Sequence, residues 1–223
     1  MTESKLVIFD CDGVLVDSEI IACRIEMAAL AALGHPIGAA DFRRNAVGRS
    51  RKDVNAMLDS LWDGTLPPDY TEQIRAATFA AFEAELQPVP GIRAVLAGLD
   101  GQRRCVASSS HPTRIARALA ATGLAEFFGS HVFSAMEVAR GKPAPDLFLH
   151  AAARMATAPQ DCLVVEDSVP GIEAAKAAGM IAVGFTAGGH CAAGHDAVLR
   201  AAGAGAVAAD GPALAALLQE WLR

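Results

Sequence analysis

The sequence lacks the cysteine patterns that mark disulfide-rich or zinc-binding proteins. Its five cysteines are odd in number, and no two of them stand in CxxC spacing, so neither a disulfide framework nor a structural zinc site is indicated. Several lie in apolar runs such as CLVVED, where a reduced cysteine behaves as a small hydrophobic residue. We therefore expect the protein to work in a reducing compartment.

The sequence also shows no pattern of a secretory leader or of a membrane span and no excess of positive charge. It does not open on a basic-then-apolar pattern, and no uninterrupted apolar stretch reaches the roughly 18 residues of a transmembrane helix. Nineteen Lys and Arg face 25 Asp and Glu, for a net charge of −6, whereas nucleic-acid-binding proteins normally carry a basic face. We expect a cytoplasmic monomer that binds a small molecule, not a membrane or a nucleic acid.

Short apolar runs alternate with amphipathic stretches along most of the chain. Residues 6–9 are continuously apolar, which suits a strand that is buried on both faces. RCVASSS, HVFSA, CLVVED and MIAVGFT are also strand-like, and helical patterns such as TRIARALAATG and VPGIEAAKAAG separate them. Strand alternating with helix predicts a doubly wound α/β domain with a mainly parallel sheet.

One segment breaks this alternation. Between 18 and 87 there is no strand-like run, and three stretches have helical patterning: 19–34, 50–62 and 70–86. QPVPG then resembles a stiff linker back to the α/β pattern. We predict a core formed by 1–17 and 88–223, with an all-helical insertion at 18–87.

Acidic side chains gather where two of the predicted strands end. Asp10 and Asp12 are two residues apart after the first strand, and Glu166 and Asp167 follow CLVV. If the two strands are neighbours, all four carboxylates meet at the carboxyl edge of the sheet, where α/β proteins bind ligands. Oxygen ligands with no nearby His or Cys suit a hard divalent cation, and Mg²⁺ is the cation we predict. The alternative is a capping pair or an Asx turn.

A cation would offset the repulsion among these carboxylates and leave Asp10 free to attack an electrophile, as in enzymes that form an aspartyl-phosphate. Asp12 is then placed to act as a general acid and base. At other strand ends, Ser108 and Ser109 offer hydroxyl and N–H groups to phosphate oxygens, and Lys142 in GKPAPD offers a cation. Taken singly, a serine-rich turn is also compatible with a plain helix cap, and GKP with a solvated turn.

The motifs DCDGVLVDSE, a strand-terminal serine, GKPAPDLF and VVEDSVPGIEAA occur in this order along almost the whole chain. In order and rough spacing they resemble the four motifs of the haloacid dehalogenase (HAD) superfamily. The nearest likeness is to the branch of β-phosphoglucomutase and sugar-phosphate phosphatases such as 6-phosphogluconate phosphatase. The resemblance implies a Rossmann-like core with an inserted helical cap that selects the substrate.

The resemblance also implies roles for the motif residues. Asp10 is expected to be the nucleophile and Asp12 the general acid and base, while Ser108 and Lys142 hold the transferring phosphoryl group. The Mg²⁺ environment is expected to consist of Asp10, the backbone carbonyl of Asp12, Glu166 and Asp167. True haloacid dehalogenases lack an aspartate at the position of Asp12, so its presence disfavours dehalogenation.

Cap residues separate a phosphatase from a mutase. Arg51 in VGRSRKD matches an arginine that holds the non-transferring phosphate in the mutase, or is a solvated charge. Ala22 stands where the mutase has a histidine, and His111 where it has a lysine. His111 either contacts a substrate oxyanion or faces solvent. We predict an Mg²⁺-dependent phosphatase of a small sugar or sugar-acid phosphate, with a phosphosugar mutase and a non-catalytic phosphometabolite sensor as alternatives.

The loop GGHCAAGHD contains His190, Cys191 and His195. Structural zinc needs four ligands, and no fourth lies nearby. We predict a plain loop at the rim of the catalytic face.

Overall fold

The computed structural model describes residues 5–46, 51–62 and 66–223. Within these residues, six strands form one sheet in the order β3-β2-β1-β4-β5-β6, and every neighbouring pair is parallel. The strands are β1 (Leu6–Phe9), β2 (Arg103–Ser108), β3 (Val132–Ser134), β4 (Cys162–Glu166), β5 (Ile181–Phe185) and β6 (Ala206–Ala208). This confirms the predicted parallel sheet and adds β6, which is too short to leave an apolar run in the sequence.

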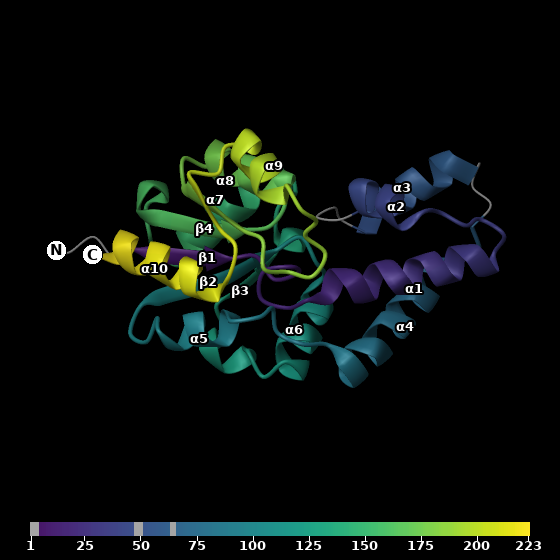
Figure 1. Cartoon of the computed structure of the whole chain (residues 1–223), viewed down its shortest axis with the longest axis horizontal. Helices are drawn as coiled ribbons and strands as arrows, with labels where there is room; N and C mark the ends of the chain where they lie inside the picture. Colours follow the sequence, from purple (N-terminus) through teal and green to yellow (C-terminus); the bar gives the residue numbers. More distant parts are fainter. Residues whose placement is uncertain (1–4, 47–50, 63–65) are drawn as a thin grey trace.

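Helices cover both faces of the sheet, as a doubly wound fold requires (Figure 1). They are α5 (Ile92–Ala97), α6 (Pro112–Ala121), α7 (Asp146–Arg154), α8 (Val169–Ala177), α9 (His195–Ala202) and α10 (Gly211–Leu222). Val7 and Phe9 pack into one apolar cluster with α5, α6 and α10, whereas Leu6 and Ile8 pack into a second with α7, α8 and α9. The first strand is continuously apolar because its side chains pack into a hydrophobic cluster on each face of the sheet. No helix in the described part of the chain is long and apolar enough to cross a membrane.

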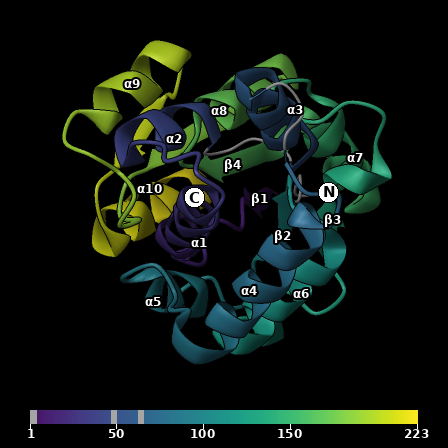
Figure 2. The same cartoon turned by 90° about the vertical axis from the view of Figure 1, so that its right-hand side faces the viewer.

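In the described residues between 18 and 87, four helices follow β1: α1 (Ser18–Ala32), α2 (Ala39–Ala46), α3 (Arg51–Trp62) and α4 (Tyr70–Glu85). They lie together beyond one end of the sheet (Figures 1 and 2). Side chains of these helices, including Leu30, Leu58 and Ile74, form an apolar cluster separate from the two core clusters. The division at 18 and 87 stays a prediction that this separate cluster supports.

Three helices were predicted between 18 and 87, and this number was wrong, because the described residues of the segment form four. The missed helix, α2, has the sequence AADFRRNA, which is too short and too polar to show an apolar stripe over several turns. The predicted 50–62 helix corresponds to α3, which begins at Arg51, and Ser50 lies outside the described residues.

The strand order creates one crevice at the carboxyl edge of the sheet. From β1 the connections run to β2 and β3 on one side, and β4, β5 and β6 lie on the other. Ligands of open α/β sheets bind where the connections diverge in this way. Phe9 pairs with Val165 in β4, so the next residues, Asp10 just after β1 and Glu166 at the end of β4, meet at this point.

Candidate active site

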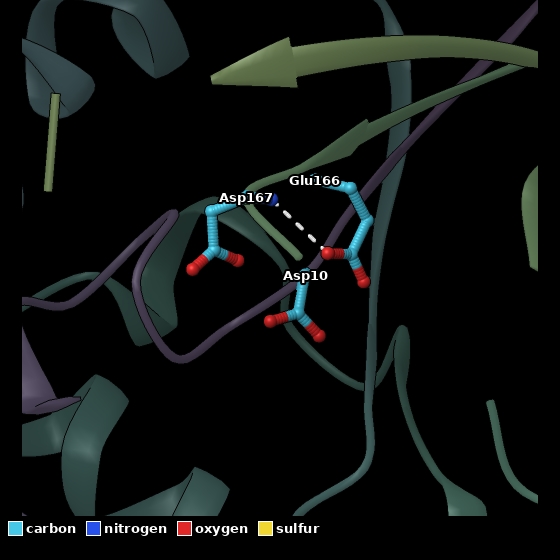
Figure 3. Close-up of side chains that lie close together, drawn as sticks. All are labelled: Asp10, Glu166 and Asp167. Atoms are coloured by element: carbon cyan, nitrogen blue, oxygen red, sulfur yellow. Dashed lines mark hydrogen bonds between the residues drawn. The ribbon is translucent and has the colours of Figure 1, made fainter. Parts of the chain in front are cut away.

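Three carboxylates face one another above the ends of β1 and β4 (Figure 3). In Asp10, Glu166 and Asp167, one carboxylate oxygen from each residue lies within 4.8 Å of the others, and all three residues are buried. Burial, together with the charges of Glu166 and Asp167, raises the pKa of Asp10 well above its usual value, although Lys142 acts in the opposite direction. The repulsion expected from the sequence is therefore present.

Lys142 partly neutralises this group. Its Nζ donates to Asp10 Oδ1 at 2.6 Å, to Glu166 Oε1 at 2.6 Å and to the Ala107 carbonyl at 3.2 Å. Burial alone would lower the pKa of Lys142, but the two carboxylates outweigh it and raise the pKa above its ordinary value. Lys142 and His190, which lies 2.8 Å from Asp167 Oδ2, together supply two positive charges, so when all three carboxylates are ionised the site retains a net negative charge.

The remaining charge and the donor set fit a divalent cation. The three side chains offer only oxygen ligands, which suits Mg²⁺ better than a soft metal. Glu166 is held in place by bonds from the backbone N–H of Asp167 and from the N–H and hydroxyl of Ser168 to Oε2, at 2.9 to 3.0 Å. Asp10, Glu166 and Asp167 are thus the side chains that would hold the cation.

Gly171 in the first turn of α8 leaves the space that Glu166 occupies. A Cβ at this position would lie 1.9 Å from the carboxylate carbon of Glu166. We expect Gly171→Ala to displace Glu166 and weaken Mg²⁺ binding by about tenfold to 100-fold, the range seen when support of a metal ligand is lost. Titration calorimetry measures the effect, and Gly205→Ala, where the nearest atom is 3.6 Å away, is the matched control. Equal Mg²⁺ affinity in both variants would contradict this role of Gly171.

Asp12 lies beside the three carboxylates and lines the same cavity, but its side chain has its own partners. Oδ1 accepts from Ser18 Oγ at 2.5 Å and Arg114 Nη2 at 2.8 Å, and Oδ2 accepts from Ser110 Oγ at 2.7 Å. Burial alone would raise the pKa of Asp12, but Arg114 and the two hydroxyls outweigh it and hold the pKa below its usual value. Asp12 is therefore a base in the resting site.

Sequence reasoning missed Arg114. This residue lies in the first turn of α6, where the helix dipole disfavours a cation. Its charge is instead balanced by a carboxylate from another element, Asp12, which no local pattern in the sequence records.

The other predicted core residues also line this cavity, whose volume is about 410 Å³. Ser108 is buried at the end of β2, and its hydroxyl accepts from the N–H of Ser110 at 3.1 Å. Ser109 lies beside it on the cavity wall. The exposed His111 caps α6 by accepting from the Thr113 N–H at 3.3 Å through Nδ1, and the residue also lines the cavity.

The helical insertion supplies the opposite wall of the cavity. Arg51 reaches this wall, but it binds Glu26 Oε1 and Oε2 at 3.0 and 2.8 Å. Tyr70 donates to Glu26 Oε1 at 2.8 Å. Arg51 is therefore part of a network around the buried Glu26, not simply a solvated charge. Glu26 and Tyr70 were not identified from the sequence. Ala22 also lines the cavity.

The loop with His190, Cys191 and His195 contacts the site through Asp167. His190 Nε2 lies 2.8 Å from Asp167 Oδ2, and His195 Nε2 lies 2.6 Å from the Asp167 carbonyl oxygen. Burial disfavours the charged form of His190, but Asp167 and Cys191 outweigh it and raise its pKa to about 11. The loop lies at the catalytic face as predicted, and it also orients Asp167, which the sequence did not indicate.

Glu19 links this site to stability. Burial and the charges of Asp12 and Asp167 raise the pKa of Glu19 from 4.5 to about 7, against Arg114 and His190. The folded protein thus binds this proton more tightly than the unfolded chain does, and it loses stability as pH rises from 4.5 to 7.

Glu19→Gln removes this loss, because glutamine does not ionise. Without added metal, we expect the variant's gain in unfolding free energy to be small at pH 5 and about 2 kcal/mol larger at pH 8. Urea unfolding at both pH values measures it. A gain in unfolding free energy that is the same at both pH values would contradict the raised pKa of Glu19.

Comparison with known proteins identifies the family to which these motifs belong. A family profile described as haloacid dehalogenase-like hydrolase matches residues 4–179. The chain belongs to the haloacid dehalogenase-like hydrolases. The predicted family is thereby confirmed.

Among the relatives of this HAD hydrolase, two with assigned activities are phosphatases. It is 28% identical over 191 residues to 6-phosphogluconate phosphatase of Escherichia coli K12, covering 85% of this chain and 86% of the relative. It is 30% identical over 180 residues to hexitol phosphatase B of the same strain, covering 78% and 79% of the two chains. The prediction of a phosphoric monoester hydrolase is confirmed.

A solved structure confirms the fold of the HAD hydrolase. A haloacid dehalogenase-like protein of Agrobacterium tumefaciens superposes with a TM-score of 0.85 and 35% identity, covering 99% of this chain and all of the other. The Rossmann-like prediction therefore holds.

Proposed function

We propose that the protein is an Mg²⁺-dependent phosphatase that hydrolyses a small sugar or sugar-acid phosphate through an aspartyl-phosphate on Asp10. The observation that carries this proposal is the placement of Asp10 between Lys142 and two further carboxylates, in a cavity of about 410 Å³. The names of the relatives, phosphatases of 6-phosphogluconate and of hexitols, support the substrate class.

The residues at the site support a two-step reaction. A carboxylate oxygen of Asp10 attacks phosphorus, and the bond from phosphorus to the leaving oxygen breaks as Asp12 donates a proton to that oxygen. Water then attacks phosphorus with Asp12 accepting its proton, and Asp10 is released as a carboxylate. The resting Asp12 is a base, so it takes up its proton with the substrate, whose negative charge raises its pKa.

Other groups hold the phosphoryl group during both steps. Lys142 fixes Asp10 and neutralises charge on the phosphoryl oxygens, and Ser108 and Ser109 provide hydroxyl or N–H donors. When bound, Mg²⁺ supplies further neutralisation of charge and orients the phosphate.

We also propose that residues 18–87 form a cap over a core of 1–17 and 88–223. The cavity is walled by both parts, so closure of the cap would exclude bulk water and opening would release the product. A cytoplasmic monomer remains the accompanying prediction from the sequence.

The mutase alternative has less support from the residues of the insertion. A mutase must protect its aspartyl-phosphate and bind a second phosphate, whereas the described wall has Ala22 where the mutase has a histidine, and Arg51 is engaged by Glu26. Hydrolysis by water is the outcome that such a wall favours.

Phosphate release from a metabolite panel tests the proposal. The panel contains hexose 6-phosphates, 6-phosphogluconate, phosphoglycolate, nucleotides and β-glucose 1-phosphate, each with Mg²⁺ or with EDTA. We expect release from sugar or sugar-acid phosphates that is lost in EDTA. Formation of glucose 6-phosphate from β-glucose 1-phosphate without release would establish the mutase, and ligand binding without any turnover would favour the sensor.

A further inference from the structure

The wall that the helical insertion contributes to the cavity differs chemically from the catalytic wall. It contains Glu26 of α1, Arg51 of α3, and Thr71 and Thr78 of α4. Because the phosphate occupies the catalytic wall in the proposed function, the remainder of the substrate faces this one. The polar groups here decide which remainder is accepted.

Glu26 is the most buried charged group on this wall. The residue is 1% exposed, and its carboxylate is matched by the two bonds from Arg51 and the one from Tyr70 described above. The Arg51 side chain is 39% exposed and Glu26 only 2%. The arginine therefore serves the buried carboxylate and does not present an uncommitted charge to the cavity.

The same holds for every described lysine and arginine that lines the cavity. Each has a carboxylate partner, the pairs being Arg51 with Glu26, Arg75 with Glu72, Arg114 with Asp12, and Lys142 with Asp10 and Glu166. A second anionic group on the substrate would find no uncommitted lysine or arginine among these residues.

Hydroxyl groups of a substrate are better matched. Thr71 Oγ1 accepts from Asn55 Nδ2 at 2.8 Å, and this occupies an acceptor position and leaves the hydroxyl proton to be donated. Thr78 adds a second hydroxyl on the same helix. Neutral donors and acceptors of this kind suit polyhydroxy compounds.

We propose that the substrate is a monophosphate whose remainder is uncharged and hydroxyl-bearing, a neutral sugar or polyol monophosphate, and that Glu26 rejects a second anionic group. The inference rests on the proposed function and narrows it by removing sugar-acid phosphates and bisphosphates. It separates this enzyme from its relative that acts on 6-phosphogluconate.

The physical basis is the cost of breaking the buried pair. Both Glu26 oxygens accept from Arg51 Nη1, so a substrate carboxylate can take this group only by displacing Glu26, which then remains buried without its cation. If the pair stays intact and the carboxylate binds the other N–H groups of Arg51, the nearby negative charge of Glu26 offsets the attraction. A neutral hydroxyl meets neither cost, so specificity arises from a repulsive element.

Two substrates that differ in one group test the proposal. Glucitol 6-phosphate and 6-phosphogluconate have the same chain and differ only in a terminal hydroxymethyl or carboxylate group. We expect the wild-type kcat/KM for glucitol 6-phosphate to exceed that for 6-phosphogluconate by about tenfold or more. An equal or inverted ratio would overturn the proposal.

Variants assign the preference to Glu26. Glu26→Gln keeps an amide oxygen for Tyr70 but frees Arg51, so we expect the ratio to fall by about tenfold through a lower KM for 6-phosphogluconate. The double variant with Arg51→Gln should lose this gain. Glu83→Gln, which breaks an exposed pair with Arg117, is the control and should keep the wild-type ratio. An unchanged ratio in a folded Glu26→Gln protein would overturn the role of Glu26.

Binding separates this inference from the proposed function. Calorimetry with Asp10→Asn and Mg²⁺ compares the two ligands without turnover. If wild type releases no phosphate from any substrate, but the variant binds glucitol 6-phosphate about tenfold more tightly, the proposed function fails and the preference of the cavity stands. If wild type hydrolyses both substrates but the variant binds 6-phosphogluconate more tightly, the proposed function stands and the inferred preference for a neutral substrate fails.

Discussion

Asparagine in place of Asp10 is expected to reduce phosphate release by about four orders of magnitude or more, because an amide cannot act as the nucleophile. The substitution preserves the shape of the side chain and retains an oxygen that can accept from Lys142, whose Nζ lies 2.6 Å from Asp10 Oδ1 in the wild type. It also removes one of three crowded negative charges, and burial and the neighbouring carboxylates already disfavour that charge. The variant should therefore fold and be at least as stable as the wild type without metal.

The measurement is phosphate release at saturating substrate and Mg²⁺, with the circular dichroism spectrum as the test of folding. Asp100 is an exposed aspartate in a turn and is not among the residues that line the cavity. Asp100→Asn is therefore the control and should retain wild-type turnover. Residual turnover of Asp10→Asn within about tenfold of wild type would refute the assignment of the nucleophile.

Replacement of Lys142 with methionine should have the second largest effect. Lys142 is the cation that contacts both Asp10 and Glu166, and removal of one such group from a buried site costs about 10²-fold to 10³-fold in turnover. It also leaves buried carboxylates without their cation, which costs about 3–5 kcal/mol when a buried pair is broken. We expect this loss of stability in EDTA and a smaller loss with Mg²⁺.

Mg²⁺ affinity distinguishes this explanation from simple disruption of the site. Without Lys142 the three carboxylates carry more net negative charge, so Mg²⁺ should bind at least as tightly while turnover falls. Calorimetry and phosphate release, measured on the same preparation, give the two quantities. Parallel loss of metal affinity and turnover would mean that Lys142 only maintains the structure.

The sheet and its acidic edge were predictable because the signals are local. A fully buried strand leaves a continuous apolar run, and β1 and β4 are both buried throughout. Asp10 and Glu166 follow directly from these runs, and the parallel pairing of the two strands brings them together. The roles of the predicted site residues themselves remain predictions for the experiments above.

Contacts between distant segments were not predictable in the same way. Arg114 reaches Asp12 across 102 residues, and Tyr70 reaches Glu26 across 44, and no periodicity records such pairs. The approach of His190 to Asp167 depends on glycines that permit close packing. A Cβ on Gly13 would lie 2.2 Å from Asp167 Oδ2, and one on Gly188 would lie 2.8 Å from the Gly13 carbonyl oxygen.

Chemical trapping of the covalent intermediate tests the central claim most directly. The enzyme is mixed with Mg²⁺ and a substrate that it turns over, quenched in acid during turnover, reduced with borohydride and digested for peptide mass spectrometry. The account predicts conversion of Asp10 to homoserine in wild type and no conversion in Asp10→Asn. Homoserine at another aspartate, with Asp10 unmodified, would contradict it.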